Sequence, residues 1–537
     1  MAETTVVQKT ASNSSDWSMK GDILRRVEGR RSDEVIIAFC GAVGCNLPDV
    51  IRNVRAQFED YGYHVEHIKI SQIIREYYRD NSWPLEGAKV DLDSLKGYER
   101  YTVFQDLGNA LRDKQGTRIL AGLAMSRIAA HRNLSSKNEK IRPPKTLYIV
   151  DQLKHHHEVE MFRMVYESIF YLVGVFSPQQ ARLNHLTKFE QIPAPQAQSL
   201  IERDRNESAA DHGQKLEKTI QLSDYFIKNN QDNSANLEEP AKRFVGLVHG
   251  KNGITPTKDE AGMYAAYSAS LKSACLSRQV GAAIANQAGN IVSVGWNDVP
   301  KFGGGLYTSD SLNDQRCVHH RGFCYNDFHK DRLISSIVNI VGVELSVSAE
   351  VKEKLSVLIQ EETRAGSIIE YSRAIHAEME AILGLARSQG GVANSCTLYT
   401  TTFPCHNCAR HIIAAGIARV VYIEPYEKSL ALDLHDDAIS LEEKKSDMTV
   451  FENFCGVSPL RYNAFFLAKG KRKNSSGKAV DVIKSEAKHI AVKYIDPYQA
   501  IEKKVVEDAL AKIGVIQDTA SAASSVVDTT DSPPDSA

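Results

Sequence analysis

The sequence predicts an α/β protein with two domains, one built on a mostly parallel sheet and one with three α/β/α layers. Short apolar runs at residues 34–39 and 146–151 are typical of buried parallel strands. Two strand patterns near residue 290 are followed, beyond residue 370, by alternating helical and strand patterns. A change of composition at residues 250–256 indicates a linker between the two regions.

The first domain is expected to span residues 31–250. Its opening strand runs into two glycines, Gly41 and Gly44, and then into a helical pattern at residues 47–61. This order indicates a buried parallel strand that enters a helix. Further strands are predicted at residues 63–70, 146–151 and 223–230.

The second domain is expected to span residues 256–515. Its first helix is predicted at residues 258–277, and a long insertion ends near residue 370. The β-β-α-β-α-β order gives the three layers. The strands are predicted at residues 280–285, 291–296, 397–402 and 419–424, and the later helices at 376–387 and 405–415. The polar flanks, residues 1–30 and 516–537, are predicted to be a disordered leader and a disordered tail.

Composition argues against several classes of protein. A hydrophobic fraction of 42% and a charged fraction of 25% are ordinary for a soluble globular chain. The net charge of -2 disfavours a strongly basic chain that coats nucleic acid. No apolar stretch reaches the roughly 18 residues of a membrane span. Nine cysteines, an odd number, fit a reducing compartment, so we expect a cytoplasmic protein. We also expect the chain to form a homo-oligomer.

Two short segments carry the chemistry, His376-Ala377-Glu378 and Pro404-Cys405-His406-Asn407-Cys408. Each lies at the start of a predicted helix. Cys405 and Cys408 are three residues apart, so both thiols point to one side of a helical turn. Two thiolates and the imidazole of His376 make three zinc ligands and leave a fourth position for water.

Glu378 lies two residues beyond His376 and is the predicted catalytic residue. Zinc lowers the pKa of bound water to about 7. Glu378 can take the proton of that water, pass it to a ring nitrogen and then protonate departing ammonia. The alternative is a closed structural zinc site, which would need a fourth protein ligand. No such ligand is evident nearby in the sequence.

The pairing of H-x-E with P-C-x-x-C is the known pattern of zinc deaminases. With residues 277–285, Gly295-Trp296-Asn297 and residues 421–426, the second domain resembles the deoxycytidylate branch of the cytidine and deoxycytidylate deaminase superfamily over residues 256–430. The resemblance implies that Asn297 binds the sugar, that Ala377 contacts the base through its backbone, and that Tyr426 packs near the nucleotide. A core role for Tyr426 is an equal alternative.

The whole architecture, a nucleotide-kinase-like region before such a deaminase, is similar to the bacterial anti-phage dCTP deaminases. This resemblance implies deamination of dCTP to dUTP, of dCMP to dUMP, or of both, which depletes DNA precursors in antiviral defence. It also implies restraint by a small regulatory RNA.

The first domain carries a degenerate P-loop. The register from Gly41 puts Asn46, Leu47 and Pro48 where a P-loop needs glycine, lysine and a hydroxyl. We therefore favour a kinase-like scaffold or sensor over an active kinase. Gly41, Gly44 and Asp151 remain candidates for contact with a nucleotide.

Phosphate recognition needs cations near the pocket, and Arg278 and Arg373 are the candidates, with surface roles as the alternative. A second metal site is a further hypothesis, because soft ligands gather in and near the insertion. The alternative is a loop with reduced cysteines and exposed histidines. The residues concerned are Cys275, Cys317, His319, His320 and Cys324.

Two rival functions remain open. A nucleic-acid editing deaminase should show a basic groove and aromatic stacking platforms. An RNA-regulated toxin scaffold would use its first domain as a switch.

Overall fold

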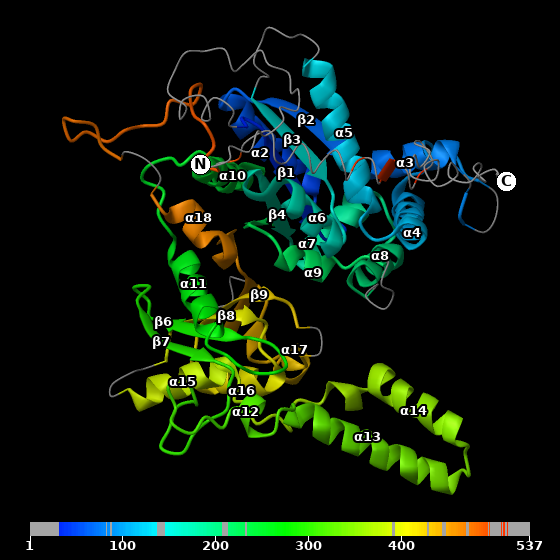
Figure 1. The fold of residues 1–537 in the computed structure, drawn as a ribbon, viewed down its shortest axis with the longest axis vertical. Helices are drawn as coiled ribbons and strands as arrows, with labels where there is room; N and C mark the ends of the chain where they lie inside the picture. The colour runs from blue at the N-terminus through cyan, green and yellow to red at the C-terminus, as the bar shows by residue number, and fades with distance from the viewer. Residues whose placement is uncertain are drawn as a thin grey trace, which may run out of the picture.

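Two six-stranded sheets organise the described part of the chain (Figure 1). They confirm the predicted α/β class with two sheets. Among the described residues, none of the helices combines the length and hydropathy needed to cross a bilayer. The computed structural model describes residues 32–81, 83–85, 89–136, 145–206, 213–230, 234–388, 393–426, 429–442, 447–468, 472–491, 493, 506, 509, 510 and 513.

The first sheet has the strand order β12-β5-β4-β1-β3-β2. The strands from β5 to β2 are parallel, and the short β12 is antiparallel to β5. Because β3 and β4 flank β1 on opposite sides, the order of the chain reverses at β1, where such sheets bind ligands. The strands are β1 (Val35–Gly41), β2 (His64–Lys69), β3 (Thr146–Asp151), β4 (Phe170–Phe176), β5 (Tyr225–Lys228) and β12 (Gly456–Val457).

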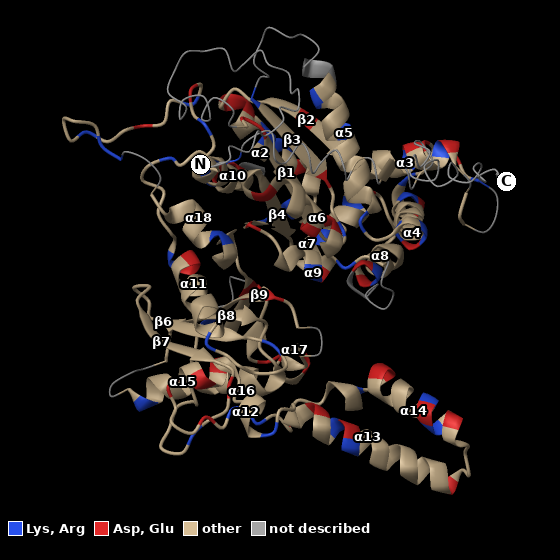
Figure 2. Ribbon diagram, viewed as in Figure 1, with Lys and Arg blue, Asp and Glu red and all other residues tan. Residues whose placement is uncertain are grey.

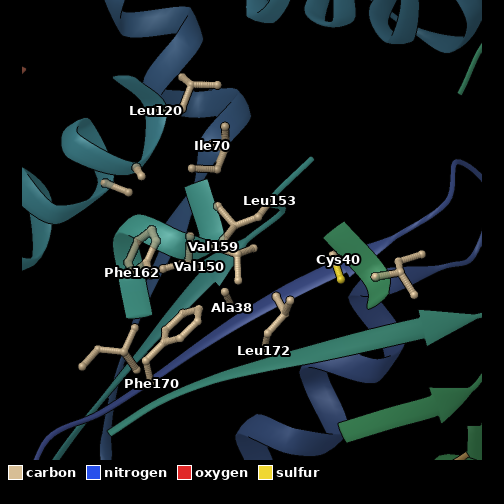
Figure 3. Close-up of a cluster of buried hydrophobic side chains, with 14 of the residues drawn as sticks. Ala38, Cys40, Ile70, Leu120, Val150, Leu153, Val159, Phe162, Phe170 and Leu172 are labelled. Carbon is tan, nitrogen blue, oxygen red and sulfur yellow. The ribbon is translucent and has the colours of Figure 1, made fainter. Parts of the chain in front are cut away.

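Helices cover both faces of this sheet. Alternate residues of β1 belong to different clusters: Ile37 and Phe39 pack with Val54 and Phe58 of α2, whereas Ala38 belongs to the cluster of α5 and α6. Figure 3 shows part of the second cluster. The helices are α2 (Leu47–Asp60), α3 (Ile70–Asp80), α4 (Gly97–Gln115), α5 (Ile119–Ser136), α6 (His156–Tyr166), α7 (Gln179–Lys188), α8 (Ala194–Asn206), α9 (Leu216–Gln221) and α10 (Glu238–Val248).

The second sheet has the order β10-β11-β9-β8-β6-β7, in which β6 is antiparallel to both neighbours and the other pairs are parallel. The helix α11 packs on one face, and α15 and α16 pack on the other, as the predicted three layers require. The elements are α11 (Lys258–Ser270), β6 (Gly281–Ala285), β7 (Ile291–Trp296), α15 (Ala377–Arg387), β8 (Thr397–Thr402), α16 (His406–Ala414), β9 (Arg419–Glu424), α17 (Ala431–Leu434), β10 (Ile439–Ser440) and β11 (Thr449–Asn453).

The first helix differs from the prediction, and the insertion contains elements that the sequence did not predict. The insertion is largely helical, with α12 (Cys317–His320), α13 (Tyr325–Glu344) and α14 (Ala349–Glu362), and the last two form a hairpin that projects from the second sheet (Figure 1). The helix α11 ends at Ser270 instead of residue 277, because the backbone N–H groups of Lys272 and Ser273 turn back to Ala269 and Ser270.

After β11 the chain returns to the first sheet through β12 and α18 (Tyr462–Phe466). Glu260 of α11 is 1% exposed and joins the two halves: it accepts a hydrogen bond from the Val457 N–H at 2.9 Å and pairs with Arg243 of α10. Phe465 packs into the core of the first domain. The proposed second domain, residues 256–515, therefore includes a segment that packs against the first sheet.

His249 follows α10 in a buried pocket of the first domain. Its ring stacks on Tyr61 at 4.2 Å, Nδ1 lies 2.8 Å from the carbonyl oxygen of Val245, and Nε2 lies 3.2 Å from the Tyr63 hydroxyl. Burial lowers the pKa of His249 from 6.5 to about 4. His249 in the folded protein thus binds a proton more weakly than it does in the unfolded chain. Neutral His249 therefore contributes to the free energy of unfolding above pH 6.5, and this contribution is lost as pH falls toward 4.

We predict that acidification from pH 6.5 to about 4 removes about 3 kcal/mol of stability through His249. His249→Phe keeps a ring but cannot titrate, so its urea unfolding curves should depend less on pH in this window. His320→Asn, at an exposed histidine, is the control. An unchanged pH dependence in His249→Phe would contradict the assignment.

Candidate active site and metal centre

Two helix N-termini meet on one face of the second sheet. α15 begins directly after His376, and α16 begins directly after Cys405. The close approach of α15 requires a glycine in β7: a Cβ on Gly295 would lie 2.2 Å from the Ala377 carbonyl oxygen and 2.4 Å from the Ala381 nitrogen. The sheet therefore holds α15 at a distance that only glycine permits.

Three predicted metal ligands come together at this point. His376 Nδ1 lies 3.3 Å from Cys405 Sγ and 3.4 Å from Cys408 Sγ. Tetrahedral zinc, with Zn–N near 2.0 Å and Zn–S near 2.3 Å, separates a nitrogen and a sulfur ligand by about 3.5 Å. The three ligand atoms all lie within 4.8 Å of one another. The donor set and its spacing fit a zinc ion.

The two thiols differ in acidity. Hydrogen bonding with Cys408, helped by the imidazole of His376, lowers the pKa of Cys405 to about 4, although burial opposes this shift. The same hydrogen bond, together with burial, raises the pKa of Cys408 well above its ordinary value. Cys405 is therefore the readier thiolate, and a bound cation favours ionisation of the second thiol.

Glu378 lies beside this cluster and is 4% exposed. Its Oε2 accepts a hydrogen bond from Cys408 Sγ at 3.5 Å. Burial raises the pKa of the Glu378 carboxyl, although the neighbouring His376 opposes this shift. A buried carboxyl with a raised pKa holds a proton more readily than a solvated one, which suits general acid–base catalysis.

A cavity of about 320 Å³ opens beside His376 and Glu378. Four of the five predicted substrate residues line it: Arg278, Asn297, Ala377 and Tyr426. The fifth, Arg373, is not among the lining residues. Its Nη1 donates to the Gln315 carbonyl oxygen at 3.2 Å, and its guanidinium lies over the ring of Tyr325.

Asn297 supports one wall of this cavity. Its Oδ1 accepts from the Val280 N–H at 2.7 Å, and its Nδ2 donates to the Arg278 carbonyl oxygen at 2.8 Å. These bonds fix the backbone from Arg278 to Val280, and the guanidinium of Arg278 lies over the ring of Tyr426. Nη1 of Arg278 also lies 3.8 Å from Oε2 of Glu424.

The root of the helical hairpin supplies lining residues that the sequence did not predict. Asn326, Asp327 and Lys330 of α13 line the cavity, as do residues 366–369. Lys330 is a second cation at the cavity, beside Arg278, and its Nζ pairs with Asp327 Oδ1 at 2.9 Å. These positions belong to no motif, and only the return of the insertion to the sheet places them here.

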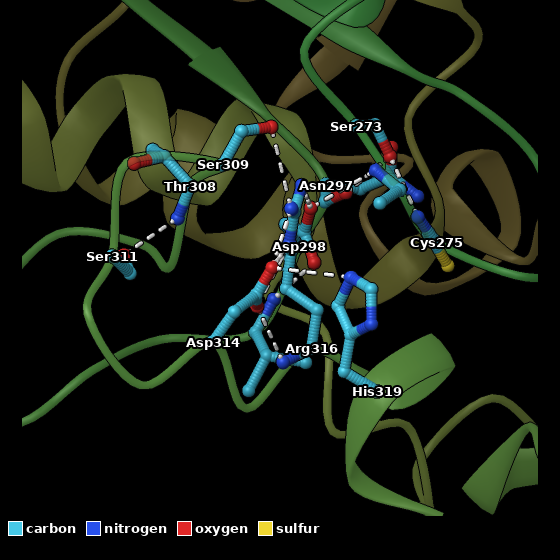
Figure 4. A network of polar contacts seen from close by, with 12 residues as sticks. Ser273, Cys275, Asn297, Asp298, Thr308, Ser309, Ser311, Asp314, Arg316 and His319 are labelled. Atoms are coloured by element: carbon cyan, nitrogen blue, oxygen red, sulfur yellow. Dashed lines mark hydrogen bonds and ion pairs between the residues drawn. The ribbon is translucent and has the colours of Figure 1, made fainter. Parts of the chain in front are cut away.

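The residues of the hypothetical second metal site separate into two groups. Cys275 and Cys324 line the cavity, and both add to the effect of burial in raising the pKa of Cys317. His319 lies 3.4 Å from Asp314, within a network that also holds Arg316 and Asp298 (Figure 4). His320 Nδ1 lies 2.8 Å from Gln315 Oε1. Among the described residues, these five do not form a tight ligand cluster.

The nucleotide-contact candidates of the first domain lie at the carboxyl end of β1 and β3. Gly44 and Asp151 line a separate cavity there. The Gly41 carbonyl oxygen accepts hydrogen bonds from the side chains of Gln152 at 2.5 Å and Lys154 at 3.1 Å. Asp151 Oδ2 lies 3.2 Å from His67 Nε2.

The second domain matches a known family. Residues 256–424 match the model of the "cytidine and deoxycytidylate deaminase zinc-binding region". The chain is 34% identical over 174 residues to the deoxycytidylate deaminase of Enterobacteria phage T4, a match that covers 30% of this chain and 76% of the phage protein. It is 33% identical over 164 residues to the phage T2 enzyme, covering 30% of this chain and 78% of that protein.

Among solved structures, the chain is similar to dCMP deaminase from the cyanophage S-TIM5 in complex with dCMP and dUMP. The sequence identity is 19% and the TM-score 0.22, with 38% of this chain and all of the phage chain covered.

We predict that Cys405→Ala abolishes stoichiometric zinc binding, because one of three ligands is removed. Metal content of the purified protein, measured by mass spectrometry, checks this. Cys455→Ser, at a partly buried cysteine outside the cluster, should keep its zinc. A full zinc equivalent in Cys405→Ala would contradict the ligand assignment.

Proposed function

The chain belongs to the cytidine and deoxycytidylate deaminase family, and on this premise we propose that it hydrolyses the amino group of deoxycytidine nucleotides. It is a deoxycytidine nucleotide deaminase with zinc as its cofactor. The buried Glu378 lies beside His376, Cys405 and Cys408 at the wall of one cavity. This arrangement is the main support for the roles that we assign to these residues.

The reaction adds water to the cytosine ring and releases ammonia, so that one C–O bond forms and the bond from C4 to the amino nitrogen breaks. When bound, zinc supplies Lewis acidity that makes water nucleophilic at neutral pH. Glu378 accepts the proton of the attacking water and delivers it to the adjacent ring nitrogen. It then takes the second proton of the added water from the new C4 hydroxyl and passes it to the departing amino group, which leaves as ammonia. The raised pKa of Glu378 suits this shuttle.

The walls of the cavity support specific contacts with the nucleotide. The backbone of Ala377 and the side chain of Tyr426 lie beside the metal cluster, where the base must sit. Asn297 holds the loop on which the sugar would rest. Arg278 and Lys330 are the cations at the cavity wall, and we assign phosphate recognition to them in preference to Arg373.

Use of dCTP in addition to dCMP, and a role in antiviral defence, are the finer parts of this proposal. They rest on the resemblance to anti-phage dCTP deaminases, as does restraint by a small RNA.

Self-association of the chain is a further part of the proposal. Several apolar side chains of the helical hairpin are exposed, among them Ile340, Val343 and Leu358, and a second copy of the chain would remove them from water.

A nucleic-acid editing deaminase is the less favoured function. Charged residues of both signs are interspersed along the hairpin, as Figure 2 shows for α14, so this projecting element offers no basic stripe to a phosphate backbone. The second rival function is an RNA-regulated scaffold. Copurification of a discrete small RNA with the full chain would support this hypothesis. Deletion of residues 1–250 is a poor test, because residues 456–466 pack against the first sheet.

We predict that the zinc-loaded protein converts dCMP to dUMP, dCTP to dUTP, or both, with one ammonia released per turnover. Chromatography of the nucleotides and an ammonia assay measure this directly. An oligonucleotide that contains cytosine should remain unchanged. Absence of both products with zinc bound would overturn the proposal, and nucleotide profiles of cells with and without the protein test the depletion of precursors.

We predict that Glu378→Gln keeps zinc and the fold but lowers turnover roughly 10⁴-fold, because the amide cannot shuttle a proton. Glu380→Gln is the matched control, since Glu380 is equally buried on the same helix but pairs with Arg387. Turnover by Glu378→Gln within tenfold of the parent would exclude the assigned role.

A further inference from the structure

A second cavity, of about 360 Å³, lies in the first domain and takes no part in the deamination site. It is bounded by the loop after β1 (residues 42–48), by the ends of β2 and β3, and by α4. This is the point at which the order of the parallel sheet reverses, and cavities there commonly hold ligands.

One face of α4 forms a wall of this cavity. Tyr101, Phe104, Gln105, Gly108 and Arg112 line it, and their spacing of three or four residues puts them on one stripe of the helix. Arg112 is fully engaged in the protein, since its Nε donates to Glu158 at 2.9 Å and both side chains are buried. The stripe therefore offers two aromatic rings and one carboxamide to a ligand.

The carboxamide of Gln105 is the unusual feature. The residue is 7% exposed, and neither Nε2 nor Oε1 has a hydrogen-bond partner within the described part of the chain. A buried amide that lacks partners on both sides destabilises the fold. A ligand with a neighbouring donor and acceptor on one edge would satisfy both atoms at once, as a nucleobase does.

The loop after β1 does not offer a phosphate cradle. The buried carboxylate of Asp204 accepts from the Val43 N–H at 2.7 Å and from Lys154 Nζ at 2.8 Å. The protein's own anion thus lies on the loop and lysine that could hold a phosphate. The cations that remain at the cavity, Lys69 and Arg100, are exposed.

We propose that this cavity is a second nucleotide site, which binds a nucleoside or nucleoside monophosphate with its base paired to the Gln105 carboxamide. Tyr101 and Phe104 supply aromatic surface for the base. Lys69 and Arg100 can meet a single phosphate at the exposed side. The site binds its ligand and performs no phosphoryl transfer, because the lysine and hydroxyl of a working P-loop are missing.

The test is calorimetric titration of the full chain carrying Glu378→Gln, so that cytosine ligands are not consumed. The probes are the deoxynucleosides of the four bases and their monophosphates, with inorganic phosphate and inorganic triphosphate as separate arms. We expect at least one base-bearing probe to bind at the cavity. Gln105→Leu should weaken this binding about tenfold or more, whereas probes that also enter the deamination site should retain that second binding event.

Gln105→Leu should unfold at the same or a higher temperature than its parent, because leucine removes an unpaired buried amide and favours a helix. Gln115→Leu, on the same helix but outside the cavity, should bind normally. Gly108→Ala is a second variant: its Cβ would meet Ile74 and Arg112 no closer than 3.5 Å, yet would narrow the ligand space and weaken binding. The proposal is overturned if no probe binds at the cavity, if Gln105→Leu and Gly108→Ala bind like the parent, or if inorganic phosphate alone accounts for the binding.

Discussion

The convergence of two helix N-termini on one face of the second sheet is the constraint on which the site depends. It brings His376 within 3.4 Å of both Cys405 and Cys408, and it buries Glu378 against the same cluster. Burial then sets the chemistry, because it raises the pKa of Glu378 while neighbouring groups lower that of Cys405. The close packing of α15 on Gly295 fixes this geometry within the sheet.

The two halves of the molecule are joined by more than a linker. Glu260, on the first helix of the second half, binds Arg243 of the first half and the backbone of β12. A single hydrophobic cluster also runs from β1 and β3 to Met263 and Tyr399. Such continuity means that a substitution in either half acts on a shared core, and that the first domain and the deaminase should not be treated as separable units.

The sequence predicted what short, strongly patterned segments encode. The strands β8 and β9 fall at the predicted residues, because each is a β-prone run that the chain bounds with turn residues. β4 is a seven-residue apolar run that the prediction missed, although the signal was present. No pattern could reveal that Lys330 returns to the cavity, that Arg373 turns toward Gln315, or that a two-residue strand joins the distant sheet. Those features depend on tertiary contacts between segments that are far apart in the sequence. The role of a kinase-like first domain stays a prediction.

We infer that one imidazole and two sulfurs hold the zinc ion, with a fourth position left for water. X-ray absorption at the zinc edge of the purified protein measures this coordination directly. We expect two sulfur ligands near 2.3 Å, one histidine nitrogen and one further light atom near 2.0 Å. A third sulfur, or a second imidazole in place of the light atom, would show a closed structural site and contradict the account.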